Sequence, residues 1–108
     1  MDKQIIYRIY CGRNISNGDT VFGAKSVSDL MLQEFISKHV CPKFMGSTLY
    51  ELAGYWNDIR EPATAIEIIA TDSEQAAAKI RIIAKRYKAE FKQDAVLVTH
   101  QSIECELI

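Results

Sequence analysis

One segment in the second half of the chain, after residue 72, has its hydrophobic residues at a helical spacing. After Thr71-Asp72, apolar residues recur every three or four positions and charged residues fill most of the others, which predicts an amphipathic helix with one buried stripe. We expect a capping box at its start, formed by Thr71 with Glu74 or by Asp72 with Gln75. The buried stripe consists of Ala76, Ile80, Ile83, Ala84, Tyr87 and Phe91.

Short β-branched segments flank this helix on both sides. Residues 65–69 read AIEII and residues 95–99 read AVLVT, and the first of them is bounded by Pro62 and Thr71-Asp72. Both segments are therefore predicted strands. Residues 61–98 are expected to form a strand, a helix and a second strand in succession.

The N-terminal part of the chain predicts one more strand and a loop. Residues 3–11 alternate between two sets of side chains, with Ile5, Tyr7, Ile9 and Cys11 in the apolar set, which is the pattern of a strand. Turn-forming residues at 12–14 and 17–19 then break the strand, and the loop continues through Gly23.

A helix is expected next in the chain. Residues 27–40 have apolar side chains at helical spacing, and either Ser26 or Ser28 is expected to cap the first turn. Cys41-Pro42 is expected to end this helix, because the residue before a proline is disfavoured in helical geometry.

Two further segments complete the predicted sheet. Residues 48–56 are rich in β-forming residues and are followed by the turn residues Asn57-Asp58, which predicts a hairpin. We expect the last strand to extend from 95–99 through a bend at His100-Gln101 to the C-terminus. In its final part the residues expected to point inward are Ile103, Cys105 and Leu107.

The predicted order of elements is strand, helix, strand, strand, helix, strand. This order is that of the split β-α-β or ferredoxin-like plait, an α+β fold. It predicts a four-stranded antiparallel sheet with two helices on one face and the spatial strand order fourth, first, third, second. Both crossover connections are expected to be right-handed.

Composition narrows the class of protein. A chain of 108 residues is expected to form one domain over residues 1–108, with one hydrophobic core. The 48% hydrophobic content without a long apolar run, and a start (MDKQIIYRIY) without a signal region, predict a soluble cytoplasmic protein. The net charge of −1 disfavours a nucleic-acid binder that works by neutralising phosphates.

The residues that commonly bind metals are few and scattered. The three cysteines, Cys11, Cys41 and Cys105, have no metal-ligand spacing, and we interpret them as small core residues rather than reactive thiols. With only two histidines in the chain, a histidine-based metal site is not expected either. The sequence predicts neither a metal nor another cofactor.

Several short motifs resemble a known family in the right order along most of the chain. They are Arg8-Ile9-Tyr10-Cys11-Gly12-Arg13, Val27-Ser28-Asp29 with Phe35, Pro42-Lys43-Phe44, Thr48 with Gly54-Tyr55-Trp56, Glu61-Pro62, Tyr87-Lys88, Phe91-Lys92-Gln93 and Val96. The chain resembles the bacterial domain-of-unknown-function family 3574. This resemblance implies a ferredoxin-like fold and brings no established activity, so no catalytic role is carried over from it.

The face of the sheet away from the helices is one candidate for a functional surface. Alternation places Arg8 and Tyr10 there from the first strand. From the later strands it places Ala65, Glu67, Ile69, Glu104 and Glu106. We expect Arg8 to pair with Glu67 or Glu104, with ligand binding by Arg8 as the alternative. An exposed apolar patch on this face favours a homodimer that buries two such faces.

The loop ends are the other candidate site. The first and second strands are expected to be parallel, which brings residues 12–14 near Trp56 and Arg60. Glycine allows close approach, arginine matches phosphate or carboxylate, and tryptophan offers a stacking surface. The candidate ligand-binding residues on both surfaces are Arg8, Tyr10, Gly12, Arg13, Asn14, Trp56 and Arg60. The alternative is structural, with Gly54 as a strand kink and Trp56 as a core anchor.

Three functions follow from these candidates. The first is a non-enzymatic homodimeric module that binds a small anionic ligand such as a nucleotide. The second is a cofactor-free enzyme of the dimeric α+β barrel type, an isomerase or monooxygenase, in which Tyr10, Glu67 or Glu104 is the acid or base. Its signature would be a buried carboxylate with a raised pKa. The third and least favoured is RNA binding on the open sheet face, where the first strand offers only Tyr10 for stacking.

Overall fold

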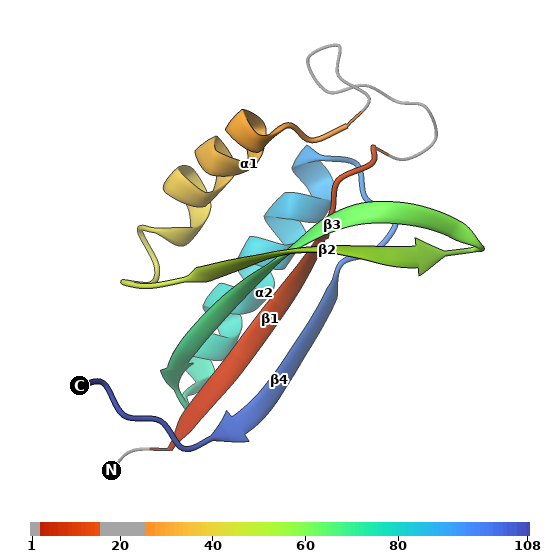
Figure 1. The fold of residues 1–108 in the computed structure, drawn as a ribbon. Coiled ribbons are helices and arrows are strands. Elements are labelled where there is room, and N and C mark those ends of the chain that lie inside the picture. Colours follow the sequence, from red (N-terminus) through yellow and green to blue (C-terminus); the bar gives the residue numbers. More distant parts are fainter. Residues whose placement is uncertain (1–2, 16–25) are drawn as a thin grey trace.

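The helices and strands were assigned in a computed structural model. It describes residues 3–15 and 26–108, apart from the side chain of Trp56. The predicted turn at 17–19 and the loop to Gly23 lie outside the described residues. The elements, shown in Figure 1, are β1 (Gln4–Gly12), α1 (Asp29–Phe35), the π-helical turn η2 (Ile36–Val40), β2 (Thr48–Trp56), β3 (Ile59–Thr71), α2 (Glu74–Glu90) and β4 (Leu97–Ile103).

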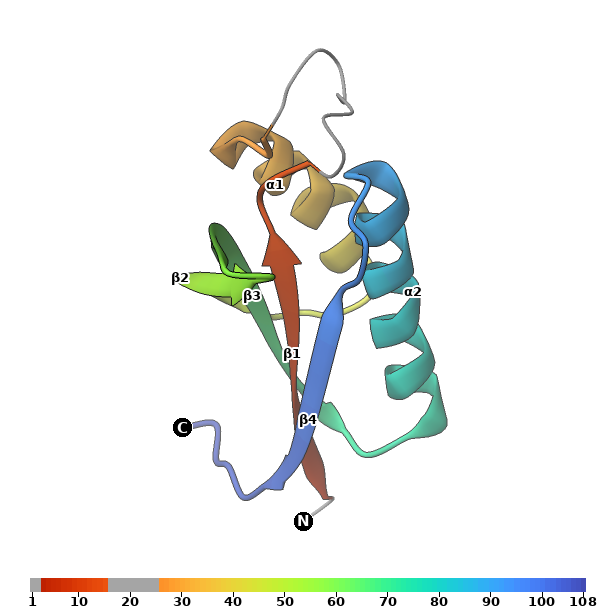
Figure 2. The same cartoon turned by 90° about the vertical axis from the view of Figure 1, so that its right-hand side faces the viewer.

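The four strands form one antiparallel sheet in the order β2-β3-β1-β4. β1 lies between β3 and β4 and is antiparallel to both, whereas β2 pairs only with β3, so β1 and β2 run in the same direction. Figure 2 shows α2 lying along one side of this twisted sheet. The predicted strand order, and the four-stranded antiparallel sheet with two helices, are confirmed.

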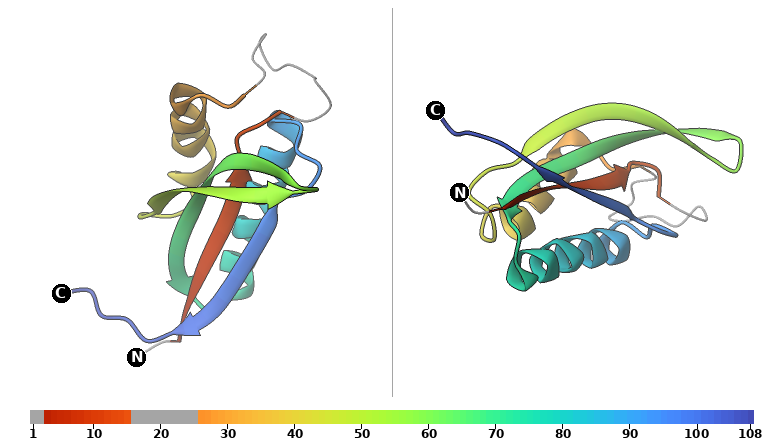
Figure 3. Two further views of the ribbon diagram at one scale, coloured as in Figure 1. Left: turned by 45° about the vertical axis from the view of Figure 1, so that its right-hand side comes forward. Right: turned by 90° about the horizontal axis from the view of Figure 1, so that it is seen from below.

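The hydrophobic core fills the space between the helices and one face of the sheet. Ile9 of β1 and Ile66 of β3 are fully buried and belong to the same cluster as Tyr87 of α2 and Phe35 of α1. The rings of Phe35 and Tyr87 meet edge to face, with centroids 5.3 Å apart. Because both helices contribute to one cluster, they cover the same face, as the view from below in Figure 3 shows.

The two helices begin at serine caps. The Ser28 hydroxyl accepts a hydrogen bond from the Met31 N–H, so the second of the two predicted caps is confirmed. The cap of α2 is Ser73, which accepts from the Ala76 N–H, and the predicted capping boxes are therefore wrong by one or two positions. Ser73 accepts from the Ala76 N–H, one of the N–H groups of the first turn that have no partner within the helix. No helix in the described part of the chain is long and apolar enough to cross a membrane.

The hairpin between β2 and β3 turns at Asn57-Asp58, as predicted. Both residues have positive φ, 49° and 62°, as in a type I′ turn, which matches the twist of the flanking strands. β3 is longer than the predicted segment 65–69 and continues past the end of β1. Ala63 pairs with Gly12, the last residue of β1, and β2 is the only strand that pairs with residues 59–62 among the described strands. The tip of the hairpin therefore overhangs the end of β1, as Figure 1 shows.

The end of the chain differs from the prediction. β4 runs from Leu97 to Ile103 without a break at His100-Gln101, and residues 104–108 form no strand. The expectation that Ile103, Cys105 and Leu107 continue the strand and point inward is wrong. Ile103 pairs with Gln4, which lies on the face of β1 away from the core residues Ile5 and Tyr7. Residues 105 and 107 lie beyond Gln4, the first residue of β1, so β1 offers them no partner. Glu104 and Glu106 are therefore not sheet-face residues.

The prediction that all three cysteines are core residues is only partly right. Cys11 is fully buried, and burial raises the pKa of its thiol to about 12, so this thiol stays protonated at neutral pH. Cys41 is exposed in the turn after η2, and Cys105 is half-buried in the tail beyond β4. Cys41 lies at the helix end that Cys41-Pro42 predicts, whereas Cys105 was expected inside the last strand, which ends at Ile103.

Candidate functional site

A groove of about 500 Å³ lies on the sheet face away from the helices, where the hairpin overhangs the end of β1. Ile9 and Cys11 of β1 point into the core. Because successive residues of a strand face opposite sides of the sheet, Tyr10 and Gly12 face the groove. The groove is bounded by β1, by the β2–β3 hairpin and by the connection from α2 to β4. Its lining residues are Tyr10, Gly12, Leu52, Gly54, Tyr55, Glu61, Ala63, Gln93, Asp94, Ala95, Val96 and Leu97.

Gly12 forms the floor of this groove, and its main chain is held on both sides. The Tyr87 hydroxyl donates to the Gly12 carbonyl over 2.6 Å, and the next residue, Arg13, donates its N–H to the Pro62 carbonyl over 3.0 Å. A methyl group added at Gly12 would overlap the Glu61 carboxylate and lie 2.7 Å from Gln93 Oε1. The absence of a side chain at Gly12 therefore leaves room for two polar side chains to converge over it.

Glu61 projects from the overhanging part of β3, opposite Gly54 of β2. Its pKa is raised above the ordinary value of 4.5, chiefly because the carboxylate is partly removed from water and then because Asp94 carries the same charge nearby. Among the described residues it has neither a hydrogen-bond donor nor a basic partner. Glu61 is thus a carboxylate whose charge no described residue compensates.

Gln93 is held in place by the chain around it. It follows Lys92, whose φ of 50° turns the chain at the end of α2, and its N–H donates to the Lys88 carbonyl over 3.0 Å. Its side-chain nitrogen donates to the Asn14 and Phe91 carbonyls over 2.7 and 3.0 Å. Gln93 is 9% exposed, so this is a buried amide with a fixed orientation.

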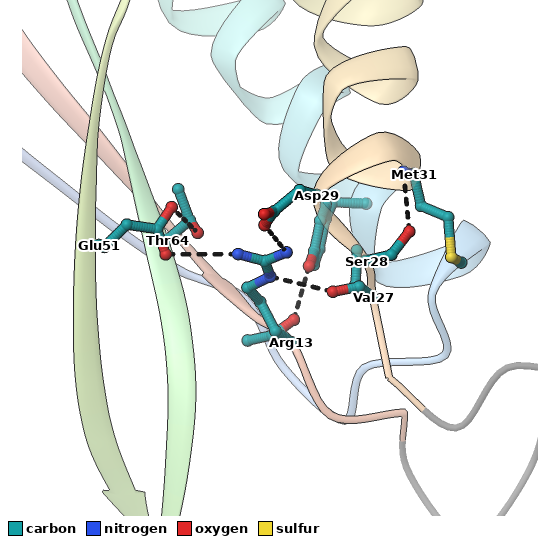
Figure 4. A network of polar contacts seen from close by, with 9 residues as sticks. Arg13, Val27, Ser28, Asp29, Met31, Glu51 and Thr64 are labelled. Atoms are coloured by element: carbon teal, nitrogen blue, oxygen red, sulfur yellow. Dashed lines mark hydrogen bonds and ion pairs between the residues drawn. The ribbon is translucent and has the colours of Figure 1, made fainter.

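A second polar group, the Arg13 cluster, lies on the other side of the hairpin and is shown in Figure 4. The Arg13 guanidinium donates to the Val27 carbonyl over 3.0 Å, to Asp29 over 2.6 Å and to Glu51 over 3.3 Å. The other oxygen of Glu51 accepts from the Thr64 hydroxyl over 3.1 Å. The Arg13 cluster comprises Arg13, Val27, Asp29, Glu51 and Thr64 and connects β1, the start of α1 and the hairpin.

The Arg13 side chain is 12% exposed and fully engaged in this cluster. Desolvation lowers its pKa, but the hydrogen bond and charge of Asp29 and the charge of Glu51 outweigh that effect, so the pKa is raised. All three guanidinium nitrogens donate to protein atoms, and Arg13 is not among the residues that line the groove.

The predicted pair on the open sheet face is confirmed. Arg8 Nε donates to Glu67 Oε1 over 3.0 Å, and the other oxygen of Glu67 accepts from the Tyr50 hydroxyl over 3.0 Å. Arg8 and Glu67 face each other across β1 and β3 in the register. Glu104 lies beyond β4 and takes no part in this pair.

The other predicted site residues are distributed along the end of the sheet. Tyr10 and Gly12 line the groove, and the Asn14 carbonyl holds Gln93 in place. Arg60 is exposed at the hairpin tip, where it pairs with Tyr55 in the register. Tyr55 is three residues beyond Leu52, the β2 residue that lies level with Gly12. Arg60 does not line the groove. Trp56 ends β2, and its side chain lies outside the described part of the structure.

Sequence reasoning did not select Glu61, Gln93 or Asp94 as site residues. Each comes from a segment that the sequence presents as an ordinary strand end or helix end. The signal that could have drawn attention to two of them is their place in the motifs Glu61-Pro62 and Phe91-Lys92-Gln93, which carry the family resemblance. What brings them together is the pairing of the long hairpin with β1 and the turn after α2.

Comparison with known proteins places the chain in a family. The family described as "Protein of unknown function (DUF3574)" matches residues 7–107, which confirms the predicted resemblance. No curated protein sequence matches the chain.

Among solved structures, a phage SAM lyase in complex with S-methyl-5′-thioadenosine matches with a TM-score of 0.70 and 18% identity. The match covers 100% of this chain and 95% of that chain. A phage SAM lyase in the apo state matches with a TM-score of 0.61 and 18% identity over 98% of this chain and 93% of that chain. At this level of identity the likeness shows a shared fold.

Proposed function

The chain belongs to the DUF3574 family, and we propose that it binds a small molecule in the groove over Gly12. One observation carries this proposal: the groove has mostly apolar walls, and Glu61, partly desolvated and without a partner among the described residues, lies in it. Concave, largely apolar sites with a few convergent polar groups and a perturbed pKa are typical of binding sites.

The contrast with the other carboxylates supports this assignment. Glu67 is bonded to Arg8 and Tyr50, and Glu51 is bonded to Arg13 and Thr64. These acids are satisfied by the protein itself, as is usual for groups held in a folded structure. Removing Glu61 from water without a partner costs free energy, so its position is explained better by a ligand than by stability.

A nucleoside is the ligand class that we propose first. The groove volume of about 500 Å³ suits a molecule of this size, and Tyr10 and Tyr55 provide flat aromatic surfaces in its wall. The shared fold adds support, because one of the similar structures holds S-methyl-5′-thioadenosine. The nucleotide expected from the sequence is less well supported, since Glu61 and Asp94 would repel a phosphate.

We further propose that the protein acts as a homodimer with a ferredoxin-like fold. The strand order supports the fold, and exposed apolar side chains on the sheet face support the dimer: Ile69 is 46% exposed and Leu97 62% exposed. Size-exclusion chromatography with light scattering over a concentration series would test the dimer, and a monomer at every concentration would contradict it. The cytoplasmic location and the absence of a cofactor stay predictions of the sequence.

A cofactor-free enzyme is the second candidate, because the raised pKa of Glu61 suits a general acid or base. Glu67 is bonded to Arg8 and Tyr50 and Glu104 lies beyond β4, so the acid or base of this alternative would be Glu61, with Tyr10 beside the ligand. Mass spectrometry of S-adenosylmethionine incubated with the protein would test it. New products that disappear with Glu61→Gln would favour the enzyme over a simple binding module.

Thermal unfolding with S-methyl-5′-thioadenosine tests the binding proposal directly. At a ligand concentration of about 100 times Kd, we expect about 2.7 kcal/mol of added stability, seen as a rise in Tm of several degrees. Tyr10→Ala removes part of the groove wall and should abolish most of this rise. Tyr50→Ala is the matched control, because Tyr50 lies in the same row of the sheet but does not line the groove. An equal rise in both variants, or none in the wild type, would contradict the proposal.

A further inference from the structure

The polar groups at the floor of the groove are hydrogen-bond acceptors. Glu61 and Asp94 are carboxylates, and Gln93 presents its carbonyl oxygen, Oε1, above Gly12. An ionised carboxylate has no donor, and the amide oxygen has none either. A ligand that meets these three groups must therefore bring its own N–H or O–H donors.

The orientation of Gln93 is decided by the carbonyls that hold it. Its NH₂ group donates to the Asn14 and Phe91 carbonyls, and these two bonds use both of its hydrogens. Turning the amide over would place Oε1 against two carbonyl oxygens, so the opposite orientation is excluded on electrostatic grounds. Oε1 is consequently fixed toward Gly12, 2.7 Å from where a methyl group on that residue would lie.

The described residues that line the groove give it a negative charge that none of them neutralises. No basic side chain is among the described residues that line the groove. Arg13 follows Gly12 in the chain, but its guanidinium is committed to Val27, Asp29 and Glu51 on the other side of the hairpin. Two tyrosine rings, Tyr10 and Tyr55, complete a lining that favours a cation by charge and by contact with aromatic faces.

We propose that the groove selects ligands that carry a primary ammonium group, with Glu61 supplying the charge and Gln93 acting as the specificity-determining acceptor. This inference rests on the proposed function and names the chemical class of its ligand. An ammonium has three donors and no acceptor, which complements Glu61, Asp94 and Gln93. A neutral thioether of the same size gains only the apolar and aromatic contacts.

Isothermal titration calorimetry with two adenosine derivatives tests this inference. S-methyl-5′-thioadenosine is neutral at its 5′ position, whereas 5′-amino-5′-deoxyadenosine carries an alkylammonium at neutral pH. We expect the amine to bind at least about tenfold more tightly to the wild-type protein, since hydrogen bonds between charged groups are roughly twice as strong as neutral ones. Equal binding, or tighter binding of the thioether, would overturn the inference and leave the proposed function standing.

Substitutions at Glu61 and Gln93 test whether these residues cause the preference for the amine. Glu61→Gln should lower the affinity for the amine about tenfold or more and leave the affinity for the thioether within about twofold. Glu104→Gln makes the same change of charge at an exposed residue beyond β4 and should alter neither affinity. Gln93→Leu should also reduce the preference for the amine, provided that its unfolding curve shows a folded protein.

The outcomes separate the two proposals. A preference for the amine that persists in Glu61→Gln would overturn the inference, because the selecting charge would lie elsewhere. If neither compound binds to the wild-type protein, the proposed nucleoside site fails and the inference fails with it. A preference that is present in the wild type, lost in Glu61→Gln and kept in Glu104→Gln supports both.

Discussion

The Arg13 cluster and the groove lie on two sides of one hairpin, and each contains a glutamate in a different electrostatic environment. In the cluster, Glu51 receives hydrogen bonds from Arg13 and Thr64. In the groove, Glu61 is partly desolvated and has Asp94 rather than a base beside it. The first arrangement holds the hairpin, the end of β1 and the start of α1 together, whereas the second leaves a charge without a basic partner among the described residues.

Consecutive residues of β1 and the loop after it serve these two regions. Gly12 forms the floor of the groove, and the side chain of Arg13 belongs to the cluster. The Tyr87 hydroxyl of α2 donates to the Gly12 carbonyl. Burial raises the pKa of Tyr87, so this hydroxyl remains a donor at neutral pH. The comparison suggests that rigid, fully paired groups position the backbone on which an unpaired group can act.

The largest effect on stability is expected from Arg13→Ala. It leaves the Val27 carbonyl, Asp29 and Glu51 without their shared donor, and we expect a loss of about 2 kcal/mol in the free energy of unfolding. Urea denaturation would measure it. Arg81→Ala, at an exposed position of α2, is the control and should change stability by less than about 0.5 kcal/mol. Equal effects of the two variants would mean that the Arg13 cluster does not hold the fold together.

Gly12→Ala should separate stability from binding. The added methyl group must displace the Glu61 carboxylate and press on Gln93, which is held by two hydrogen bonds. We expect a loss of about 1 kcal/mol in unfolding free energy, together with at least about tenfold weaker ligand binding by calorimetry. Gly46→Ala is a matched control, because an added methyl there meets nothing within 4 Å and Gly46 does not line the groove. Unchanged affinity in Gly12→Ala would indicate that the ligand does not use the floor of the groove.

Glu51→Gln and Glu61→Gln should have effects of opposite sign. The first removes a charge that Arg13 neutralises and should lower the free energy of unfolding by about 0.5 kcal/mol. The second removes a charge that nothing in the described structure neutralises and should raise Tm slightly at neutral pH. Parallel melting curves would measure both changes. Destabilisation by Glu61→Gln would show that Glu61 has a structural partner and would remove the contrast between the two regions.

The smallest expected effect is a pH dependence of the difference in Tm between Glu61→Gln and the wild type. Because the folded protein raises the pKa of Glu61 above 4.5, the folded state holds this proton more tightly than the unfolded state. The destabilisation by the ionised carboxylate is therefore present above the raised pKa and disappears as the pH falls through it toward 4.5. The Tm of Glu61→Gln should exceed that of the wild type at pH 7.5, and the difference should shrink at acidic pH. A difference that grows on acidification would contradict the raised pKa.

Much of the fold could be predicted from local patterns, and the misses have physical causes. The apolar stripe of α2 and the strong turn at Asn57-Asp58 specify their elements within a few residues, so these predictions hold. The last residue of β4, Ile103, lies opposite Gln4, the first residue of β1. The alternation of residues after Ile103 could not show that β1 offers no partner there. The cap of α2 is Ser73 rather than Thr71 or Asp72, because adjacent polar residues are nearly equivalent as caps.

The candidate site was predicted only in its β1 residues. Tyr10 and Gly12 were selected from parity and from the glycine, and both line the groove. Arg13 and Arg60 were expected to meet a ligand because arginine suits anions, yet Arg13 is occupied by Asp29 and Glu51, and Arg60 stands at the hairpin tip. A residue type indicates which bonds a side chain can make, but its neighbours decide whether those bonds are already made.

The sequence by itself determined the order of the elements, the family and the core-facing side chains of β1, and it limited the partner of Arg8 to Glu67 or Glu104. These follow from periodicity and from residues that lie opposite each other in adjacent strands. Only the tertiary structure decided that the hairpin extends past β1 and that the turn at Lys92 brings Gln93 over Gly12. It also decided that Arg13 is paired, whereas Glu61 has no partner in the described part of the chain. Compensation of charge depends on distances between segments far apart in the chain, and those distances are set by packing.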